Sequence, residues 1–130
     1  VNQSDHLKQR ELARVSAAIG KTISAQQLMV SSEIEYKRGQ VLGFKGRALV
    51  QLAFLSSTGD PLALCIIKTV GEVARSSELG GAGRTDIEHV QMEGMSSASW
   101  TRNGYEFLLI GGQDSTLVAN LAKRFAEANL

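Results

Sequence analysis

The sequence predicts an α+β domain: a four-stranded, mainly antiparallel sheet of hairpins with an N-terminal and a C-terminal helix. Three observations predict it. Residues 5–20 repeat apolar side chains at helical spacing, residues 47–68 contain two apolar runs around a turn, and residues 98–130 contain a hairpin signal followed by a capped helix. A chain of 130 residues suits one domain, 1–130, which can bury a core without disulfides or metals.

Residues 1–22 are expected to form a helical stem. Its apolar side chains recur three and four residues apart, at Leu12, Val15 and Ile19, and Gly20 follows as a stop signal. Because this apolar stripe is narrow, we expect the helix to pack against the rest of the domain from one side only.

The segment between this stem and residue 44 has no clear periodicity. Residues 24–28 favour a short second helix, and Gly39, Gly43 and Gly46 then indicate a loop. The sheet and the closing helix are therefore expected to occupy residues 44–130.

Two strands are predicted at residues 47–56 and 62–68, joined by a turn at Gly59-Asp60-Pro61. Both faces of each strand are mostly apolar, which is typical of central strands that are covered on both sides. We therefore expect one helix on each face of the sheet, or a second molecule on one face.

The segment at residues 70–88 is polar and glycine-rich, which predicts an exposed loop. Residues 89–95 and 98–102 then resemble a single strand that is bent or bulged near Gly94. This strand is expected to lead directly into the last hairpin.

Asn103-Gly104 is the strongest hairpin signal in the chain, because both residues tolerate the positive φ of a type I′ turn. The turn leads into a last strand at residues 105–111, and Asp114 or Ser115 is expected to cap the closing helix. Trp100 and Tyr105 flank the turn, so we expect them to form a cross-strand aromatic pair.

Composition argues against several classes of function. The net charge is +1 and the basic residues are dispersed, whereas nucleic-acid binding favours a concentrated basic surface. No apolar run approaches the roughly 18 residues of a membrane span. Cys65 is the only cysteine and lies in an apolar strand, so neither a disulfide framework nor a cysteine zinc site is expected.

No motif for catalysis is present, and we expect no cofactor, no metal and no enzymatic activity. The chain lacks a Gly-x-Ser-x-Gly elbow and a phosphate-binding loop. The best candidates for a ligand or partner loop are Arg84, Asp86, Glu88 and His89. On a strand, however, Asp86 and Glu88 would share one face and His89 the other, so these groups would not converge. An alternative is a small-molecule binding domain or a new enzyme that uses residues 70–93 as a lid.

A wider pattern spans residues 44–130. It comprises Gly59-Asp60-Pro61-Leu62-Ala63-Leu64-Cys65, then Trp100, Gly104-Tyr105, Gly111 and the closing helix. This pattern resembles the extracytoplasmic, C-terminal domain of bacterial transmembrane anti-sigma-factor-like proteins. The resemblance implies a cytoplasmic, often zinc-containing, sigma-binding segment and one membrane helix, neither of which lies within these 130 residues. The zinc ligands of that segment have no counterpart here.

The resemblance implies a non-enzymatic sensory or interaction domain at the periplasmic face of the inner membrane. The start at Val1 favours a domain excised from a membrane-anchored transcription regulator, attached through the stem. The expected partner is another protein or a second copy of the chain, because an uncovered apolar sheet face would suit a homodimer. Contact with the membrane is expected only through a segment that this chain lacks.

Overall fold

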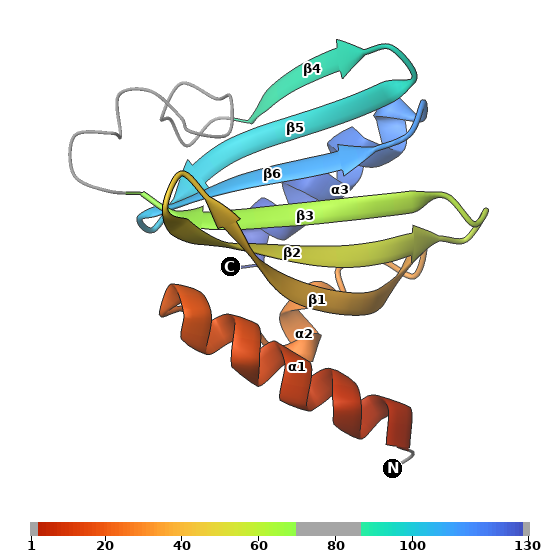
Figure 1. Ribbon diagram of the computed structural model, residues 1–130. Helices are drawn as coiled ribbons and strands as arrows, with labels where there is room; N and C mark the ends of the chain where they lie inside the picture. The colour runs from red at the N-terminus through yellow and green to blue at the C-terminus, as the bar shows by residue number, and fades with distance from the viewer. Residues whose placement is uncertain (1–2, 70–86, 129–130) are drawn as a thin grey trace.

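A six-stranded antiparallel sheet in the order β1-β2-β3-β6-β5-β4 forms the frame of the molecule (Figure 1). The computed structural model describes residues 3–69 and 87–128. The expected exposed loop at residues 70–88 therefore falls mostly outside the described residues. The elements are α1 (Gln3–Ile19), α2 (Ala25–Leu28), β1 (Ile34–Phe44), β2 (Arg47–Ser56), β3 (Pro61–Lys68), β4 (Glu88–Met92), β5 (Met95–Arg102), β6 (Tyr105–Gly111) and α3 (Ser115–Glu127).

The α+β class and the two terminal helices are confirmed, but the predicted count of four strands is wrong. One additional strand is β1, where glycines had indicated a loop. The other arises because Glu93-Gly94 forms a tight turn, with Gly94 at φ 68°, between β4 and β5. What the sequence presented as one bent strand is thus a hairpin.

Strand β1 contains Gly39 because Tyr36 and Leu52 leave little room for a side chain at this position. A Cβ atom on Gly39 would lie 2.9 Å from the Tyr36 hydroxyl and 3.0 Å from a methyl group of Leu52. A β-bulge between Tyr36 and Arg38 shifts the register, so that Tyr36 and Gly39 pair with residues that both belong to the buried core, Phe54 and Leu52. Here glycine marks a crowded strand, not a loop.

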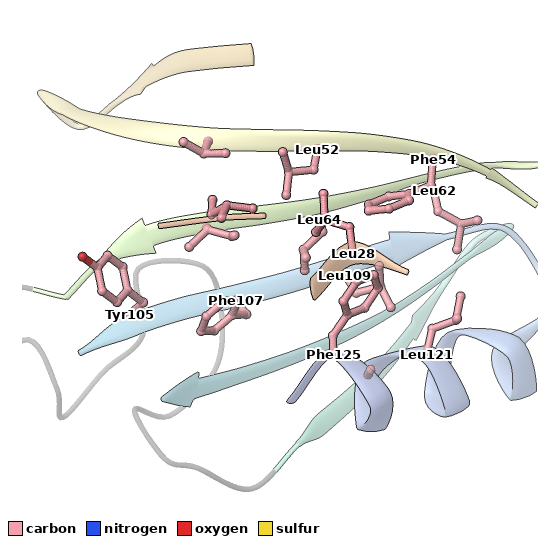
Figure 2. Packing of buried hydrophobic residues seen from close by; sticks show 14 of the residues in the cluster. Leu28, Leu52, Phe54, Leu62, Leu64, Tyr105, Phe107, Leu109, Leu121 and Phe125 are labelled. Carbon is pink, nitrogen blue, oxygen red and sulfur yellow. The ribbon is translucent and has the colours of Figure 1, made fainter. Parts of the chain in front are cut away.

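Both long helices pack on the same face of the sheet, so the prediction of one helix on each face is wrong. Helix α1 lies against β1 and β2, and α3 lies against β5 and β6 (Figure 1). Short helix α2 begins at Ser24, which forms a capping box with Gln27. Figure 2 shows Leu28 of α2 among core side chains from β3, β6 and α3.

The core between the helices and this face is large and continuous. Its fully buried members include Val15, Leu52, Phe54, Leu64, Ile66, Phe107, Leu109, Leu121 and Phe125. Phe54 of β2 and Phe125 of α3 join the part of the core near α1 to the part near α3, and their ring centroids lie 5.6 Å apart. Burial of each such side chain contributes about 1.5–3 kcal/mol, so the helices are integral parts of the fold.

The other face of the sheet carries Leu49, Cys65 and Ile67, which are buried, and no described helix packs on it. Leu42 and Leu55 on the same face are about one-third exposed. Cys65 is a free thiol whose pKa is raised because burial disfavours the thiolate. It therefore has the character of a buried hydrophobic residue, as expected.

The predicted boundaries of the last hairpin and helix are close to the observed ones. Asn103 and Gly104 have φ 54° and 83°, as a type I′ turn requires, and the Asp114 side chain accepts a hydrogen bond from the Leu117 N–H. The expected Trp100–Tyr105 pair is wrong. Trp100 lies opposite Phe107, with stacked rings 5.3 Å apart, because the two-residue turn places Tyr105 opposite Arg102.

In the described part of the chain, none of the helices combines the length and the apolar character needed to cross a membrane. The sequence predicted a single domain in which residues 1–22 form a helical stem and the sheet begins at residue 44. Helix α1 buries Leu12, Val15 and Ile19 in the common core, and the sheet begins at Ile34, before residue 44.

Candidate functional site

Two polar latches hold α1 on the sheet. At the first, the Glu11 carboxylate accepts hydrogen bonds from the Tyr36 hydroxyl at 2.8 Å and from the Gly39 N–H at 2.5 Å. The pKa of Tyr36 is raised, chiefly because burial disfavours the phenolate and also because Glu11 accepts its proton in a hydrogen bond. The bulge in β1 makes this latch possible, since it places Tyr36 and Gly39 on the helix side.

The second latch lies where α1 ends. Tyr105 of β6 donates its hydroxyl proton to the carbonyls of Ile19, at 2.8 Å, and Gly20, at 3.1 Å. Gly20 has φ 67°, and the Lys21 N–H donates back to the Ser16 carbonyl, so the helix closes in a Schellman motif. The phenol thus satisfies carbonyls that a helix end leaves without partners.

A small cavity of about 390 Å³ lies beside this latch, between the end of α1 and strands β2 and β3. Its lining includes Arg47 and Lys68, and the Arg47 guanidinium donates to the Lys68 carbonyl at 2.8 Å. Nearby Lys21 lies over the Tyr105 ring, and its pKa is lowered by burial and by the charge of Arg102. Four basic side chains of the described residues therefore lie at this end: Lys21, Arg47, Lys68 and Arg102.

A second cavity, of about 400 Å³, separates the β4–β5 hairpin from the first turns of α3. We call it the β4–α3 groove. Its polar lining among the described residues is His89, Gln91, Ser96, Ser97, Ser115, Thr116 and Asn120. Among the described residues, this lining holds no Asp, Glu, Lys or Arg, and its hydrogen-bonding groups are neutral hydroxyls and amides together with the His89 imidazole.

Ser96 lies in the groove in an unusual state. Its side chain is 3% exposed, and its hydroxyl oxygen has no hydrogen-bond partner among the described residues. A buried hydroxyl without a partner is uncommon and destabilising. Among the described residues, this hydroxyl is therefore a buried polar group beside the groove that lacks a partner.

The predicted ligand or partner loop is only partly visible. Arg84 and Asp86 lie outside the described residues. Glu88 and His89 are adjacent in β4 and point to opposite faces, because Glu88 pairs with Ser99 and His89 with Ala98. His89 lines the β4–α3 groove, whereas Glu88 faces the other side of the sheet.

The residues of the wider pattern occupy structural positions. Gly59 and Gly104 have positive φ in turns, Cys65 is buried in β3, and Trp100 is buried in β5. Gly111 lies beneath α3, and a Cβ atom there would lie 2.6 Å from a methyl group of Val118. Tyr105 differs from the rest because it also forms the second latch.

In the ranges 3–69 and 87–128, no three His, Cys, Asp or Glu side chains come together as a metal-binding group would require. Sequence reasoning missed Glu11, Tyr36 and Ser96. A single acidic residue in a helix or a serine in a strand does not by itself indicate a functional site. Glycine at 39 was the one available hint of close approach, and it was interpreted as a loop.

Comparison with models of known protein families gave no match, and comparison with curated proteins found no relative.

Proposed function

We propose that this domain is a non-enzymatic sensory and interaction module of a membrane-anchored, anti-sigma-factor-like regulator, positioned at the periplasmic face of the inner membrane. The proposal starts from the sequence pattern at Gly59–Cys65, Trp100, Gly104-Tyr105 and Gly111. In the fold these residues form the turns and packing contacts that join β2, β3, β5, β6 and α3.

The observation that carries the proposal is the attachment of α1 to the sheet at two separate points. Glu11 binds β1, and Tyr105 of β6 binds the end of the helix. His6 and Leu7, which lie in α1 before Glu11, have exposed side chains. A partner that displaces β1 or β6 would therefore shift α1, and α1 would pass that change to whatever it is joined to.

The arrangement of the candidate polar residues favours an interaction role over catalysis. Glu88 and His89 point to opposite faces of β4, so the acid and the imidazole do not act on one substrate atom. The alternative of a lid enzyme depends on residues 70–86, which lie outside the described residues. No specific observation favours it.

The proposal is tested in the parent protein. The gene upstream of Val1 should encode a membrane-spanning helix and a sigma-binding segment, and removal of residues 22–130 should change the output of a sigma-dependent reporter. Glu11→Ala should produce part of the same change, because it removes the first latch. Glu33→Ala, at an exposed acid just before β1, is the matched control and should leave the reporter unchanged.

A parent without a membrane helix, or a reporter that does not respond to removal of the domain, contradicts the proposal. If Glu11→Ala leaves the reporter unchanged, only the proposed role of α1 in passing on a change in the sheet is contradicted.

A further inference from the structure

Strand β1 forms one edge of the sheet, and no described strand pairs with its outer side (Figure 1). Residues 70–86 connect β3 to β4, neither of which is next to β1. Gly39 belongs to the β1–β2 ladder, yet its N–H donates to the Glu11 carboxylate at 2.5 Å and so points away from β2. Because these groups alternate along an antiparallel ladder, and the register is regular from Gly39 onward, the N–H and C=O of Val41 and Gly43 also point outward.

The Glu11 carboxylate takes the place that a carbonyl of a neighbouring strand would have at Gly39. Natural sheets protect their edges with charged groups, bulges and covering helices. The first half of β1 has all three, since Glu11 of α1 and the bulge after Tyr36 lie there. Among the described residues, no side chain caps the outward groups of Val41 and Gly43 in this way. The open part of the strand, residues 41–44, is called the β1 edge below.

The β1 edge exposes apolar side chains on both faces of the sheet. Val41 is 40% exposed and lies opposite Val50, on the face that carries the core. Leu42 is 39% exposed and lies opposite Leu49, on the other face. An added strand would cover both side chains while it pairs with the outward backbone groups. The edge thus offers apolar burial and hydrogen bonds together.

Basic side chains lie at both ends of the β1 edge. Lys37 and Arg38 precede it, Lys45 follows it, and all three are exposed. The acids beside them are engaged, because Glu35 Oε2 lies 3.6 Å from the Lys37 ammonium and Glu11 accepts two hydrogen bonds. A segment that is apolar in its centre and acidic at its ends therefore complements this edge.

A second copy of the chain is a poor occupant because the charges oppose it. In an antiparallel pair of two β1 edges, the Lys37-Arg38 end of each copy would lie beside the Lys45 end of the other. Like charges in cross-strand positions are destabilising. The ends of the β1 edge therefore favour a partner of opposite charge.

We infer that the β1 edge binds an extended segment of a protein partner, apolar in its centre and acidic at its ends, which adds as an antiparallel strand. An added strand that continues past residue 41 reaches the Gly39 N–H and competes for it with Glu11. Binding is thereby coupled to the first latch of α1. The inference names the docking strand and the partner chemistry of the proposed interaction module, and it rests on that proposal.

The test uses the whole 130-residue chain, labelled with ¹⁵N, and three blocked heptapeptides: EEVTVEE, the neutral QQVTVQQ and the basic KKVTVKK. We expect EEVTVEE to shift the amide signals of residues 39–44 and to leave those of β4 unchanged. QQVTVQQ should bind about threefold to tenfold more weakly, the range expected for loss of several exposed ion pairs, and KKVTVKK more weakly still. Added salt should reduce these differences.

Val41→Pro removes an outward N–H without removing a bond of the β1–β2 ladder, and proline is tolerated at such edge positions. It should weaken binding of EEVTVEE by about threefold to tenfold, the range expected for one hydrogen bond. The matched control is Gln91→Pro in β4, the opposite edge strand. Its cross-strand neighbour Ser96 donates its N–H to the Gly112 carbonyl at 2.9 Å, away from β4, so the Gln91 N–H also points outward. This variant should bind the peptide normally.

Charge reversal keeps the test decisive if Val41→Pro fails to fold. Arg38→Glu changes an exposed side chain beside the β1 edge and should abolish the preference for EEVTVEE over QQVTVQQ. Lys123→Glu makes the same kind of change at an exposed position of α3 and should retain that preference.

The competition with Glu11 is measured with QQVTVQQ, so that loss of a negative charge does not itself favour the peptide. Glu11→Ala should bind it about threefold to tenfold more tightly, because no carboxylate has to leave the Gly39 N–H. Tyr36→Phe is the matched control, since it removes the other hydrogen bond of the latch and leaves Gly39 bonded to Glu11. It should bind QQVTVQQ as the wild type does.

An absence of shifts in residues 39–44 at millimolar EEVTVEE, equal binding of the acidic and basic peptides, or unchanged binding by folded Val41→Pro overturns the inference. Self-association of the free chain through residues 39–44 overturns the choice of occupant. If Glu11→Ala binds QQVTVQQ no more tightly than the wild type, the coupling to the latch is overturned.

The two proposals fail in different ways. If the parent regulates a sigma factor but the domain binds no peptide, only the present inference is overturned. If the peptide binds as described but the parent has no link to a sigma factor, only the regulatory assignment is overturned.

Discussion

Tyr36 shows how one side chain can join two elements that are distant in sequence. Its hydroxyl donates to Glu11 of α1, and its ring packs edge-on against Phe54 of β2, with centroids 5.8 Å apart. Glu11 also accepts from the Gly39 N–H, so one carboxylate satisfies two donors from β1. Hydrogen bonds to a charged acceptor are stronger than neutral ones, which makes this contact a significant part of α1 docking.

Stability should fall at alkaline pH because of this residue. Burial and Glu11 raise the pKa of Tyr36 above its usual value of 10.0, so the folded state favours the neutral phenol. The resulting stabilisation is complete below about pH 10, the unfolded pKa, and is lost as pH rises from there toward the folded pKa. Urea unfolding between pH 8 and 11 should therefore show a decline that is smaller in Tyr36→Phe.

The control for this prediction compares the wild-type protein with Tyr36→Phe, by subtracting one curve of unfolding free energy against pH from the other. The pKa of Cys65 is also raised by burial, so its ionisation lowers stability in the same direction in both. Subtraction of the Tyr36→Phe curve removes that contribution. Parallel curves for wild type and Tyr36→Phe above pH 10 would show that the phenol does not contribute.

At the scale of elements, the seat of α3 depends on Gly111 at the end of β6. The helix packs so closely that Val118 and Leu62 occupy the space a side chain at this position would need. Gly111 and Gly112 are adjacent in the sequence, and no local pattern distinguishes them. The structure separates the two glycines, because Gly111 is buried under α3 and Gly112 has open space around its Cα.

Gly111→Ala should therefore destabilise the domain by about 1–3 kcal/mol, the usual cost of overpacking a close contact. Gly112→Ala is the matched control and should change the free energy of unfolding by less than about 0.5 kcal/mol, as surface substitutions usually do. Urea denaturation at pH 7 measures both. Equal effects of the two substitutions would mean that α3 can shift without cost.

At the scale of the whole molecule, α1 belongs to the common core. Leu12, Val15 and Ile19 are 4%, 0% and 5% exposed, and all three pack against the sheet. The chain that follows α1 is tied back to it, since the Ile23 N–H donates to the Ser16 hydroxyl at 2.9 Å. The N-terminal segment and the sheet should thus fold together.

Removal of residues 1–20 should leave a chain that is largely unfolded or aggregated. Burial of three such side chains contributes roughly 4.5–9 kcal/mol, which is comparable to the net stability of a small domain, about 5–15 kcal/mol. Circular dichroism and NMR spectra would measure the loss. A synthetic peptide of residues 3–20, added in trans, should restore the native spectrum.

A truncated chain with a sharp thermal transition near that of the full chain would contradict this expectation. The exposed position Leu7, at 58%, provides a comparison within the same helix, because Leu7→Ala should leave the transition nearly unchanged.

The sequence by itself determined the elements whose signals are local. The periodicity of α1, the Asn103-Gly104 turn, the Asp114 cap and the hairpin of β2 and β3 depend on neighbouring residues, and each was predicted. Strand β1 was missed because Gly39 reflects close contacts with Tyr36 and Leu52, which form only once the bulged strand pairs with β2. The β4–β5 turn was missed because one glycine fits either a bulge or a turn.

Only the tertiary structure decided which face the helices cover and which polar groups meet. Apolar residues on both strand faces did not indicate that α1 and α3 share one side, because burial depends on what the distant helices contact. In the same way, Glu11 meets Tyr36 and Gly39, and Ser96 comes to line one groove together with α3, only after the sheet has assembled. These contacts join segments that no local pattern connects.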